Sequence, residues 1–211
     1  MPTIVPAILT SDENVYHENL LKADHVCKLI QVDIVDGQFA ANRTIGAEVV
    51  SKYLTNAYLE IHLMVKYPQN YIDDFVKIEH VSRIILPWEV ESNHQEYIYH
   101  IKNHSKQVGL SINPATPVSA ILHFLDDIDL LLFLAVEPGF QGQGFKREVL
   151  DKVIQVKKVA PGLAVEIDGG VRYENAREIA DSGVDFISAG SILYKAEDFY
   201  VAYDKLVDLV K

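Results

Sequence analysis

Short apolar segments rich in β-branched residues alternate with longer amphipathic segments along the whole chain. Nearly continuous apolar runs are typical of strands buried on both faces, as in a parallel sheet covered by helices. Eight strands are predicted, at Thr3–Leu9, Leu29–Ile34, Tyr58–Met64, Ser82–Pro87, Gln107–Ile112, Leu130–Val136, Leu163–Asp168 and Asp185–Ala189. Eight strand–helix units in 211 residues predict a (β/α)8 TIM barrel that forms one domain over residues 1–211.

The segments between these strands carry apolar residues at helical spacing. The stretch Val149–Val159 and the C-terminal stretch Phe199–Val210 both place them on one face of a helix. Helix starts are predicted at Ser11–Asp12, Thr116–Pro117 and Tyr173–Glu174. An open doubly wound sheet is the alternative architecture, but such sheets rarely use eight regular units.

Net charge and cysteine content limit the partners and the compartment. The net charge of −11 argues against a nucleic-acid partner, which needs clustered Lys and Arg, although local donors can still hold a small anion. Cys27 is the single cysteine and forms no internal disulfide, so a cytoplasmic protein is expected. We expect no membrane partner, because the sequence has no signal-peptide pattern and no run of about 18 apolar residues.

Three residues that can carry acid–base chemistry end predicted strands. Asp33, His62 and Asp168 end the second, third and seventh, and in a parallel barrel these ends meet at the mouth where active sites lie. Two carboxylates and an imidazole predict acid–base catalysis, with or without a metal ion. Alternatively, the aspartates cap turns and His62 is a core histidine. Six other histidines are expected on solvated helix surfaces: His17, His25, His94, His100, His104 and His123.

Two glycine pairs follow the last two predicted strands. Gly169-Gly170 comes after the seventh strand and Gly190-Ser191 after the eighth, the two loops that often bind phosphate in these barrels. Glycines let backbone N–H groups approach phosphate oxygens, and Ser191 adds a hydroxyl. The alternative interpretation is that these are ordinary turn glycines.

A third glycine-rich stretch, 137–144, follows the sixth strand and contains Gly139 and Gly142. We expect it to form a loop over the same mouth, with a plain surface loop as the alternative. Met64 lies two residues after His62 and therefore shares its face of the strand. It is either part of the core or an apolar wall beside a reacting carbon.

Several strings of the sequence occur together, in a fixed order, in one known family. The chain resembles the ribulose-phosphate 3-epimerase family over nearly its whole length. This resemblance implies a phosphate-binding (β/α)8 barrel that interconverts ribulose 5-phosphate and xylulose 5-phosphate. The strings that carry it are Pro6–Leu9, Val32–Gly37, His62–Val65, Asn113–Pro117, Val136–Phe140, Glu166–Val171 and Ala189–Ser191.

The resemblance also implies roles for individual residues. Asp33 and Asp168 become the two acid–base groups on opposite faces of an enediolate, and a divalent metal is held by these aspartates and two histidines, one of them His62. Gln31 stands where the family usually has the other histidine. Glutamine offers only a neutral amide oxygen, so zinc should bind more weakly, and Mn, Fe, Co, Mg or no metal becomes plausible.

Other departures from the family pattern also fall at the predicted mouth. Ala7 replaces the usual serine that contacts substrate, whereas Val35 and Leu134 replace methionines beside the reacting carbon. Pro87 stands where a histidine is common, and Gln141 replaces a glycine of the phosphate-side loop. The chain is therefore interpreted as a divergent member, acting on a ketopentose or ketohexose phosphate.

Two other functions remain as alternatives. A catalytically silent phosphosugar-binding protein is suggested by the changes at Ala7, Gln31 and Pro87. Related decarboxylases use an Asp-x-Lys-x-x-Asp string, and the corresponding segment Asp33–Asp36 has no lysine, so this chemistry is disfavoured. Members of the resembled family assemble as dimers or larger rings, so a homo-oligomer is expected.

Overall fold

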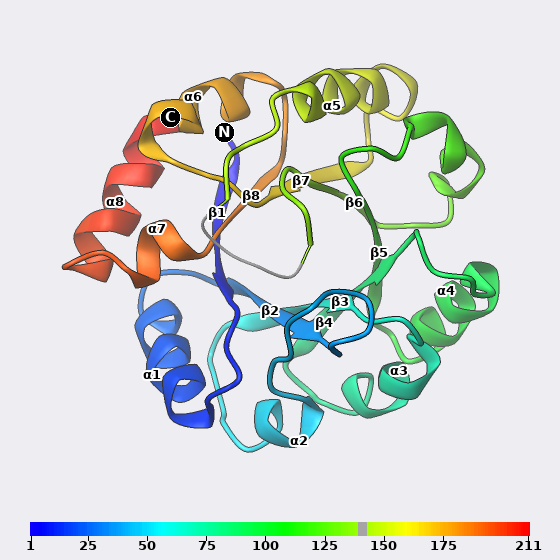
Figure 1. The fold of residues 1–211 in the computed structure, drawn as a ribbon, viewed down its shortest axis with the longest axis horizontal. Helices are drawn as coiled ribbons and strands as arrows, with labels where there is room; N and C mark the ends of the chain where they lie inside the picture. Colours follow the sequence, from blue (N-terminus) through cyan, green and yellow to red (C-terminus); the bar gives the residue numbers. More distant parts are fainter. Residues whose placement is uncertain (139–142) are drawn as a thin grey trace.

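The computed structural model describes residues 1–138 and 143–211. Within these residues, eight parallel strands close into a barrel in the order β1 to β8, and β1 pairs with β8 (Figure 1). The predicted (β/α)8 barrel is therefore confirmed, and the open sheet is wrong because such a sheet leaves two edge strands unpaired. The strands are β1 (Thr3–Ile8), β2 (Leu29–Val35), β3 (Tyr58–Met64), β4 (Val81–Pro87), β5 (Gln107–Ile112), β6 (Leu130–Leu134), β7 (Ala164–Asp168) and β8 (Phe186–Ala189).

Helices surround the barrel and cover the outer faces of its strands (Figure 1). The Asp12 side chain accepts hydrogen bonds from Asn14 N and Val15 N, which fixes a helix start at the predicted place. Another predicted start, Tyr173, is also the first residue of a helix. The helices are α1 (Glu13–Asp24), α2 (Ala47–Val50), α3 (Gln69–Phe75), α4 (His94–Asn103), α5 (Glu148–Val159), α6 (Tyr173–Asp181), α7 (Ser191–Tyr194) and α8 (Phe199–Leu209).

The connection between β5 and β6 departs from the regular pattern. The predicted start at Thr116–Pro117 leads only into two 3-10 turns, η1 (Val118–Ala120) and η2 (Leu122–Phe124). Ile121 between them is fully buried, so tight turns still bring an apolar side chain onto the barrel. Such 3-10 turns satisfy the hydrogen-bonding groups of the backbone over a few residues, where no longer helix forms.

The barrel interior is divided into an apolar half and a polar half. A separate apolar cluster comes from β4 and β6: Ile85, Leu130, Leu132 and Leu134. Buried polar side chains come from β2, β3, β7 and β8: Gln31, Asp33, Glu60, His62, Glu166 and Ser188. Because side chains alternate along a strand, each of these strands sends polar groups inward and apolar groups toward the helices.

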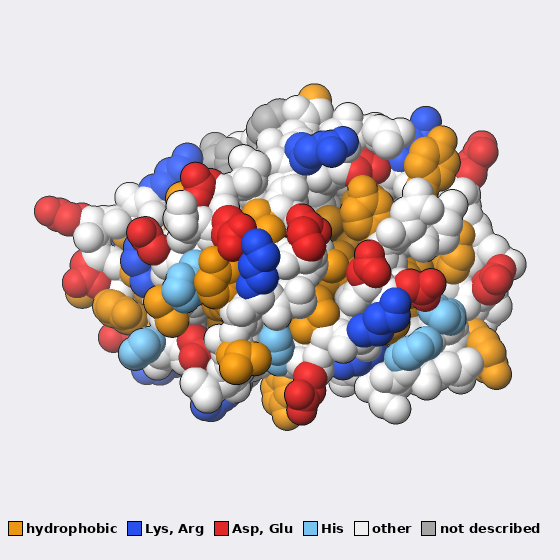
Figure 2. Space-filling model, turned by 90° about the horizontal axis from the view of Figure 1, so that it is seen from below, with side chains coloured by type: hydrophobic (Ala, Val, Ile, Leu, Met, Phe, Trp, Pro, Cys, Tyr) orange, Lys and Arg blue, Asp and Glu red, His pale blue; other side chains and the backbone are white. Residues whose placement is uncertain are grey.

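The outer surface mixes acidic, basic, histidine and apolar side chains across the face that Figure 2 shows. One histidine expected in solvent is buried, so that prediction was wrong. His94 is only 7% exposed, lies 3.0 Å from the Pro87 carbonyl oxygen through Nε2, and packs against Trp88. A backbone acceptor and an aromatic neighbour at the start of α4 outweigh its preference for water. Across residues 1–138 and 143–211, no helix has the length and apolar character needed to cross a membrane.

Candidate active site

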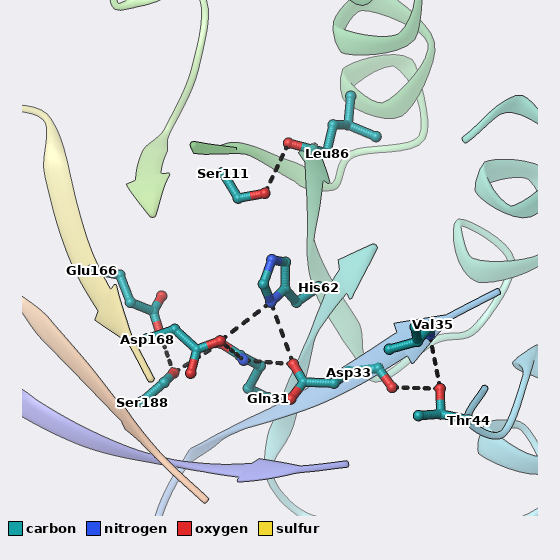
Figure 3. A network of polar contacts seen from close by, with 10 residues as sticks. All are labelled: Gln31, Asp33, Val35, Thr44, His62, Leu86, Ser111, Glu166, Asp168 and Ser188. Atoms are coloured by element: carbon teal, nitrogen blue, oxygen red, sulfur yellow. Dashed lines mark hydrogen bonds and ion pairs between the residues drawn. The ribbon is translucent and has the colours of Figure 1, made fainter. Parts of the chain in front are cut away.

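Asp33, His62 and Asp168 come together at the carboxyl ends of β2, β3 and β7. Asp33 is paired with His62 in the register of β2 and β3, and barrel closure brings Asp168 beside them. His62 Nδ1 lies 3.3 Å from Asp33 Oδ1 and 3.4 Å from Asp168 Oδ2 (Figure 3). The sequence therefore predicted correctly that these three side chains share one mouth.

Gln31 joins the two carboxylates from below. It lies two residues before Asp33 on β2, so its side chain enters the barrel on the same face. Its Nε2 donates hydrogen bonds to Asp33 Oδ1 at 2.7 Å and to Asp168 Oδ2 at 3.0 Å (Figure 3). The amide thus bridges the same two oxygens that face His62.

The electrostatics of this group follow from burial and close charges. Burial disfavours a charged His62 ring, but the contacts with Asp168 and Asp33 outweigh it and raise its pKa to about 10. With no metal ion bound, these contacts therefore favour the imidazolium form of the ring at neutral pH. Burial is also the main reason that the pKa of Asp33 is raised, with the charge of Asp168 acting in the same direction against His62 and Gln31.

The same residues suit a divalent metal ion. Ligand atoms of Asp33, His62 and Asp168 all lie within 4.8 Å of one another. Among the described residues, neither ring nitrogen of His62 makes a hydrogen bond of good geometry, so Nδ1 is available to a metal once deprotonated. Gln31 turns its N–H groups toward this space, so it becomes a fourth ligand only if the amide rotates to present Oε1.

A pocket opens above these carboxylates at the barrel mouth. Ala7 and Met64 lie on its wall, as does Leu134, whereas Val35 and Pro87 are buried outside its lining. Its wall above the carboxylates is apolar, which suits a reacting carbon. The lining residues are Ala7, Leu9, Asp33, Met64, Leu134, Val136, Pro138, Asp168, Gly169, Gly170, Val171, Arg172, Ser188, Gly190, Ser191 and Ile192.

The glycines at one side of the pocket are required by geometry. Gly169 has φ +98° and Gly170 has φ +70°, a region that L side chains rarely adopt. A Cβ added at Gly170 would lie 2.7 Å from Phe145 Cα. Gly190 and Ser191 line the same side. The other glycines expected to bind substrate, Gly139 and Gly142, lie outside the described residues.

Three further polar residues at the site were not found from the sequence. Arg172 lines the pocket, and its position two residues after Gly170 was the available signal. Ser188 and Glu166 lie beneath Gln31 on β8 and β7. Polar residues inside otherwise apolar strands were the signal for these two, but their partners are remote in sequence.

Comparison with known proteins identifies the family. Residues 3–194 match the model of the Ribulose-phosphate 3 epimerase family. The chain belongs to this family. A ribulose-phosphate 3-epimerase from Serratia marcescens is 35% identical over 206 residues, covering 93% of this chain and 97% of that protein. The Escherichia coli K12 ribulose-phosphate 3-epimerase is 32% identical over 211 residues, covering 96% and 93%.

Solved structures of other enzymes share the fold of this epimerase-family chain. A tryptophan synthase α-subunit from Pyrococcus furiosus has a TM-score of 0.75 at 14% identity, covering 99% of this chain and 97% of that one. A 3-hexulose-6-phosphate synthase from Salmonella typhimurium has a TM-score of 0.70 at 17% identity, covering 98% and 97%. At such identities the likeness concerns the fold alone.

Membership of the epimerase family decides between the alternatives left open by the sequence. Its relatives are epimerases along nearly their full length, so an isomerase that acts on a phosphorylated sugar is supported. The catalytically silent binding protein is not favoured.

Proposed function

We propose that the protein interconverts D-ribulose 5-phosphate and D-xylulose 5-phosphate, with Asp33 and Asp168 as the two acid–base groups. The observation that carries this proposal is the pair of carboxylates from β2 and β7, bridged by Gln31 and facing His62 beneath one pocket. Family membership supports the substrate class.

Inversion at carbon 3 needs a base on one face of the carbon and an acid on the other. The hydrogen is acidic because the carbanion formed next to the ketone is delocalised as an enediolate. One aspartate removes it, and the other, protonated, returns a hydrogen to the opposite face. The raised pKa of Asp33, caused mainly by burial, suits a carboxyl group that must carry a proton for part of the cycle.

The enediolate carries negative charge that the site must balance. Without a metal ion, the imidazolium of His62 lies between the two carboxylates and supplies positive charge there. A bound divalent ion would supply that charge in its place, with the neutral ring as a ligand. Met64 and Leu134 line the pocket beside it and exclude water from the planar intermediate. The positive charge thus acts on the negative charge that develops during the reaction, and the apolar side chains keep water away from it.

The phosphate group is proposed to bind at the glycine side of the pocket. Gly169, Gly170 and Gly190 offer backbone N–H groups, and Ser191 offers a hydroxyl. Arg172 adds a guanidinium at the same side, and guanidinium groups bind phosphate in a bidentate geometry. Gly139 and Gly142 stay predictions as substrate contacts.

We propose that a divalent ion is held by Asp33, His62 and Asp168. Gln31 as a fourth ligand stays a prediction, because its N–H groups point at the two carboxylates and the amide would have to turn over. When bound, the ion polarises the ketone and stabilises the enediolate oxygens. Two carboxylates and a single imidazole suit Mn, Fe, Co or Mg better than zinc, which prefers imidazole and thiolate.

Nuclear magnetic resonance on ribulose 5-phosphate tests the proposed reaction. Wild-type protein is stripped of metal, then assayed alone and after adding Zn, Mn, Co, Fe or Mg. Formation of xylulose 5-phosphate under any of these conditions supports the proposal. If no condition yields xylulose 5-phosphate or exchanges the carbon-3 hydrogen with deuterated water, the substrate assignment is wrong.

We also propose that the protein works in the cytoplasm as a homo-oligomer. The buried thiol of Cys27 forms no disulfide in the structure, and burial raises its pKa to about 12, which keeps it unreactive. Light scattering after size-exclusion chromatography measures the oligomeric state, and a monomeric mass would contradict this part of the proposal.

A further inference from the structure

A chain of buried polar groups continues beneath the carboxylates into the barrel. The Ser188 hydroxyl lies 2.8 Å from Gln31 Oε1 and also contacts Glu166 Oε1 (Figure 3). Gln31 and Glu166 are 0% exposed and Ser188 is 1% exposed, so bulk water does not replace these contacts. These hydrogen-bonded side chains connect β7, β8 and β2 across the polar half of the barrel.

The number of polar hydrogens on these side chains decides which group donates in each of their hydrogen bonds. The amide of Gln31 has two N–H hydrogens, and these go to Asp33 and Asp168. Its Oε1 must then accept from Ser188, whose hydroxyl has one hydrogen. The remaining contact, between Ser188 and Glu166, therefore takes its hydrogen from the Glu166 carboxyl group.

The surroundings of Glu166 agree with a neutral acid at this place. The side chain is fully buried, and Glu60 lies near it on β3. A fully buried carboxyl group beside a second one is costly in its charged form unless it has a cationic partner. Arg83 Nη1 lies 2.7 Å from Glu60 Oε2, so Glu60 has its own cationic partner.

The reverse orientation of the Gln31 amide is unfavourable while the two aspartates are ionised. It would turn Oε1 toward two carboxylate oxygens, which are also acceptors, and turn an N–H group toward Ser188. In the observed orientation, every polar hydrogen of the Gln31, Ser188 and Glu166 side chains has an acceptor. The carboxylates disfavour the reverse orientation, and the Ser188 hydroxyl, by donating its one hydrogen to Oε1, holds the amide in the observed one.

We propose that Ser188 and Glu166 are positioning residues that orient the Gln31 amide, so that its two N–H groups hold the catalytic carboxylates in place. This inference rests on the proposed function, because it gives Asp33 and Asp168 their roles. The neutral acid of Glu166, the hydroxyl of Ser188 and the amide of Gln31 form a hydrogen-bonded relay. This relay supports the carboxylates at a position where the family pattern has an imidazole. Neither Ser188 nor Glu166 is required to contact substrate for this effect.

The kinetic test is a double-mutant cycle between Ser188 and Gln31. Ser188→Ala should lower kcat about tenfold with a KM changed less than about twofold, because the carboxylates are held less firmly. In a Gln31→Met background, which lacks the amide, the same Ser188→Ala change should lower kcat less than about twofold. An equal loss in both backgrounds would overturn the proposal, since Ser188 would then act independently of Gln31.

Conservative variants give the matched controls. Ser188→Thr keeps the hydroxyl and should recover most of the kcat that Ser188→Ala loses. Glu166→Gln keeps a neutral donor of the same shape, whereas Glu166→Met removes it and should lower kcat about as much as Ser188→Ala. A Glu166→Gln variant as impaired as Glu166→Met would contradict the inferred hydrogen-bond direction. Thermal melts verify that each variant is folded.

A second readout separates this inference from the proposed function. The side-chain amide hydrogens of Gln31, observed by 15N NMR, should exchange slowly with solvent in the wild type and shift in Ser188→Ala. If the wild type does not convert ribulose 5-phosphate, the proposed function fails while these signals still test the relay. Unchanged Gln31 amide signals in Ser188→Ala would overturn the relay whatever the activity.

Discussion

Gln31 is the residue whose chemistry most distinguishes this site from the pattern of its family. An amide donates two hydrogens to the carboxylates, and it is a weaker metal ligand than an imidazole. Electrostatic support for the carboxylates therefore comes from the amide hydrogens and the His62 imidazolium together. We therefore expect Gln31 to favour hydrogen bonding to the carboxylates over zinc binding.

Replacing Gln31 with histidine should strengthen zinc binding. We expect Gln31→His to raise the zinc affinity at least about tenfold, because a second imidazole then joins His62 and the two aspartates. Titration calorimetry on metal-stripped protein measures this without relying on turnover. Gln31→Met, which offers no oxygen, is the matched control and should not bind zinc more tightly than wild type. Equal zinc affinity in wild type and Gln31→His would refute the assignment of this position to the metal site.

Arg172 lines the glycine side of the pocket. Its proposed contact with the substrate phosphate is tested by replacing it with a neutral residue. We expect Arg172→Gln to raise the KM for ribulose 5-phosphate about 10- to 100-fold with a smaller change in kcat, because a charged phosphate contact is lost. Arg177→Gln is the matched control, since Arg177 pairs with Asp181 on the outer face of α6. An unchanged KM in Arg172→Gln would place phosphate elsewhere.

At the scale of elements, the sequence predicted the strands well and one connection poorly. Nearly continuous apolar runs identify the strands, because a strand buried on both faces of a parallel sheet needs apolar side chains on both. The β5–β6 connection has fewer constraints, and Val118–Phe124 folds as 3-10 turns rather than as a helix. The burial of His94 was also missed, because it depends on Trp88 and Pro87 meeting it in space.

Asp24 links the end of α1 to the segment before β3, and its effect on stability should depend on pH. It accepts hydrogen bonds from Thr55 Oγ1, Asn56 N and Ala57 N. Partial burial opposes its ionisation, but the bonds from Thr55 and Asn56 outweigh it, so its pKa is lowered below the ordinary value of 3.8. The carboxylate therefore stabilises the fold above that pH.

Asp24→Asn should lower the free energy of unfolding by about 1 to 2 kcal/mol at pH 7. Because the folded-state pKa is lowered, this difference should be fully present above pH 3.8 and shrink as the pH falls below it. Urea unfolding of both proteins between pH 7 and pH 3 measures it. Asp126→Asn, on an exposed turn, is the matched control. A difference that is the same at pH 3 and pH 7 would contradict this account.

At the scale of the whole molecule, closure of the barrel creates the site. Asp33 and Asp168 lie far apart in sequence, and β1 and β8 stand between their strands in the closed order. The sequence predicted that strand ends converge, so the carboxylates and His62 could be found before the structure. The relay through Ser188 and Glu166 could not, because it depends on which inward side chains from β2, β7 and β8 lie at the same level.

Asp33 and Asp168 are proposed to act on opposite faces of one carbon. Carbon-3 hydrogen exchange in deuterated water, followed by NMR, tests it with Asp33→Asn and Asp168→Asn, each lowering epimerisation about 10²- to 10⁴-fold. One variant should still exchange the carbon-3 hydrogen of ribulose 5-phosphate without forming xylulose 5-phosphate. The other should exchange the carbon-3 hydrogen of xylulose 5-phosphate without forming ribulose 5-phosphate. A folded variant that epimerises at the wild-type rate would contradict the two-base account.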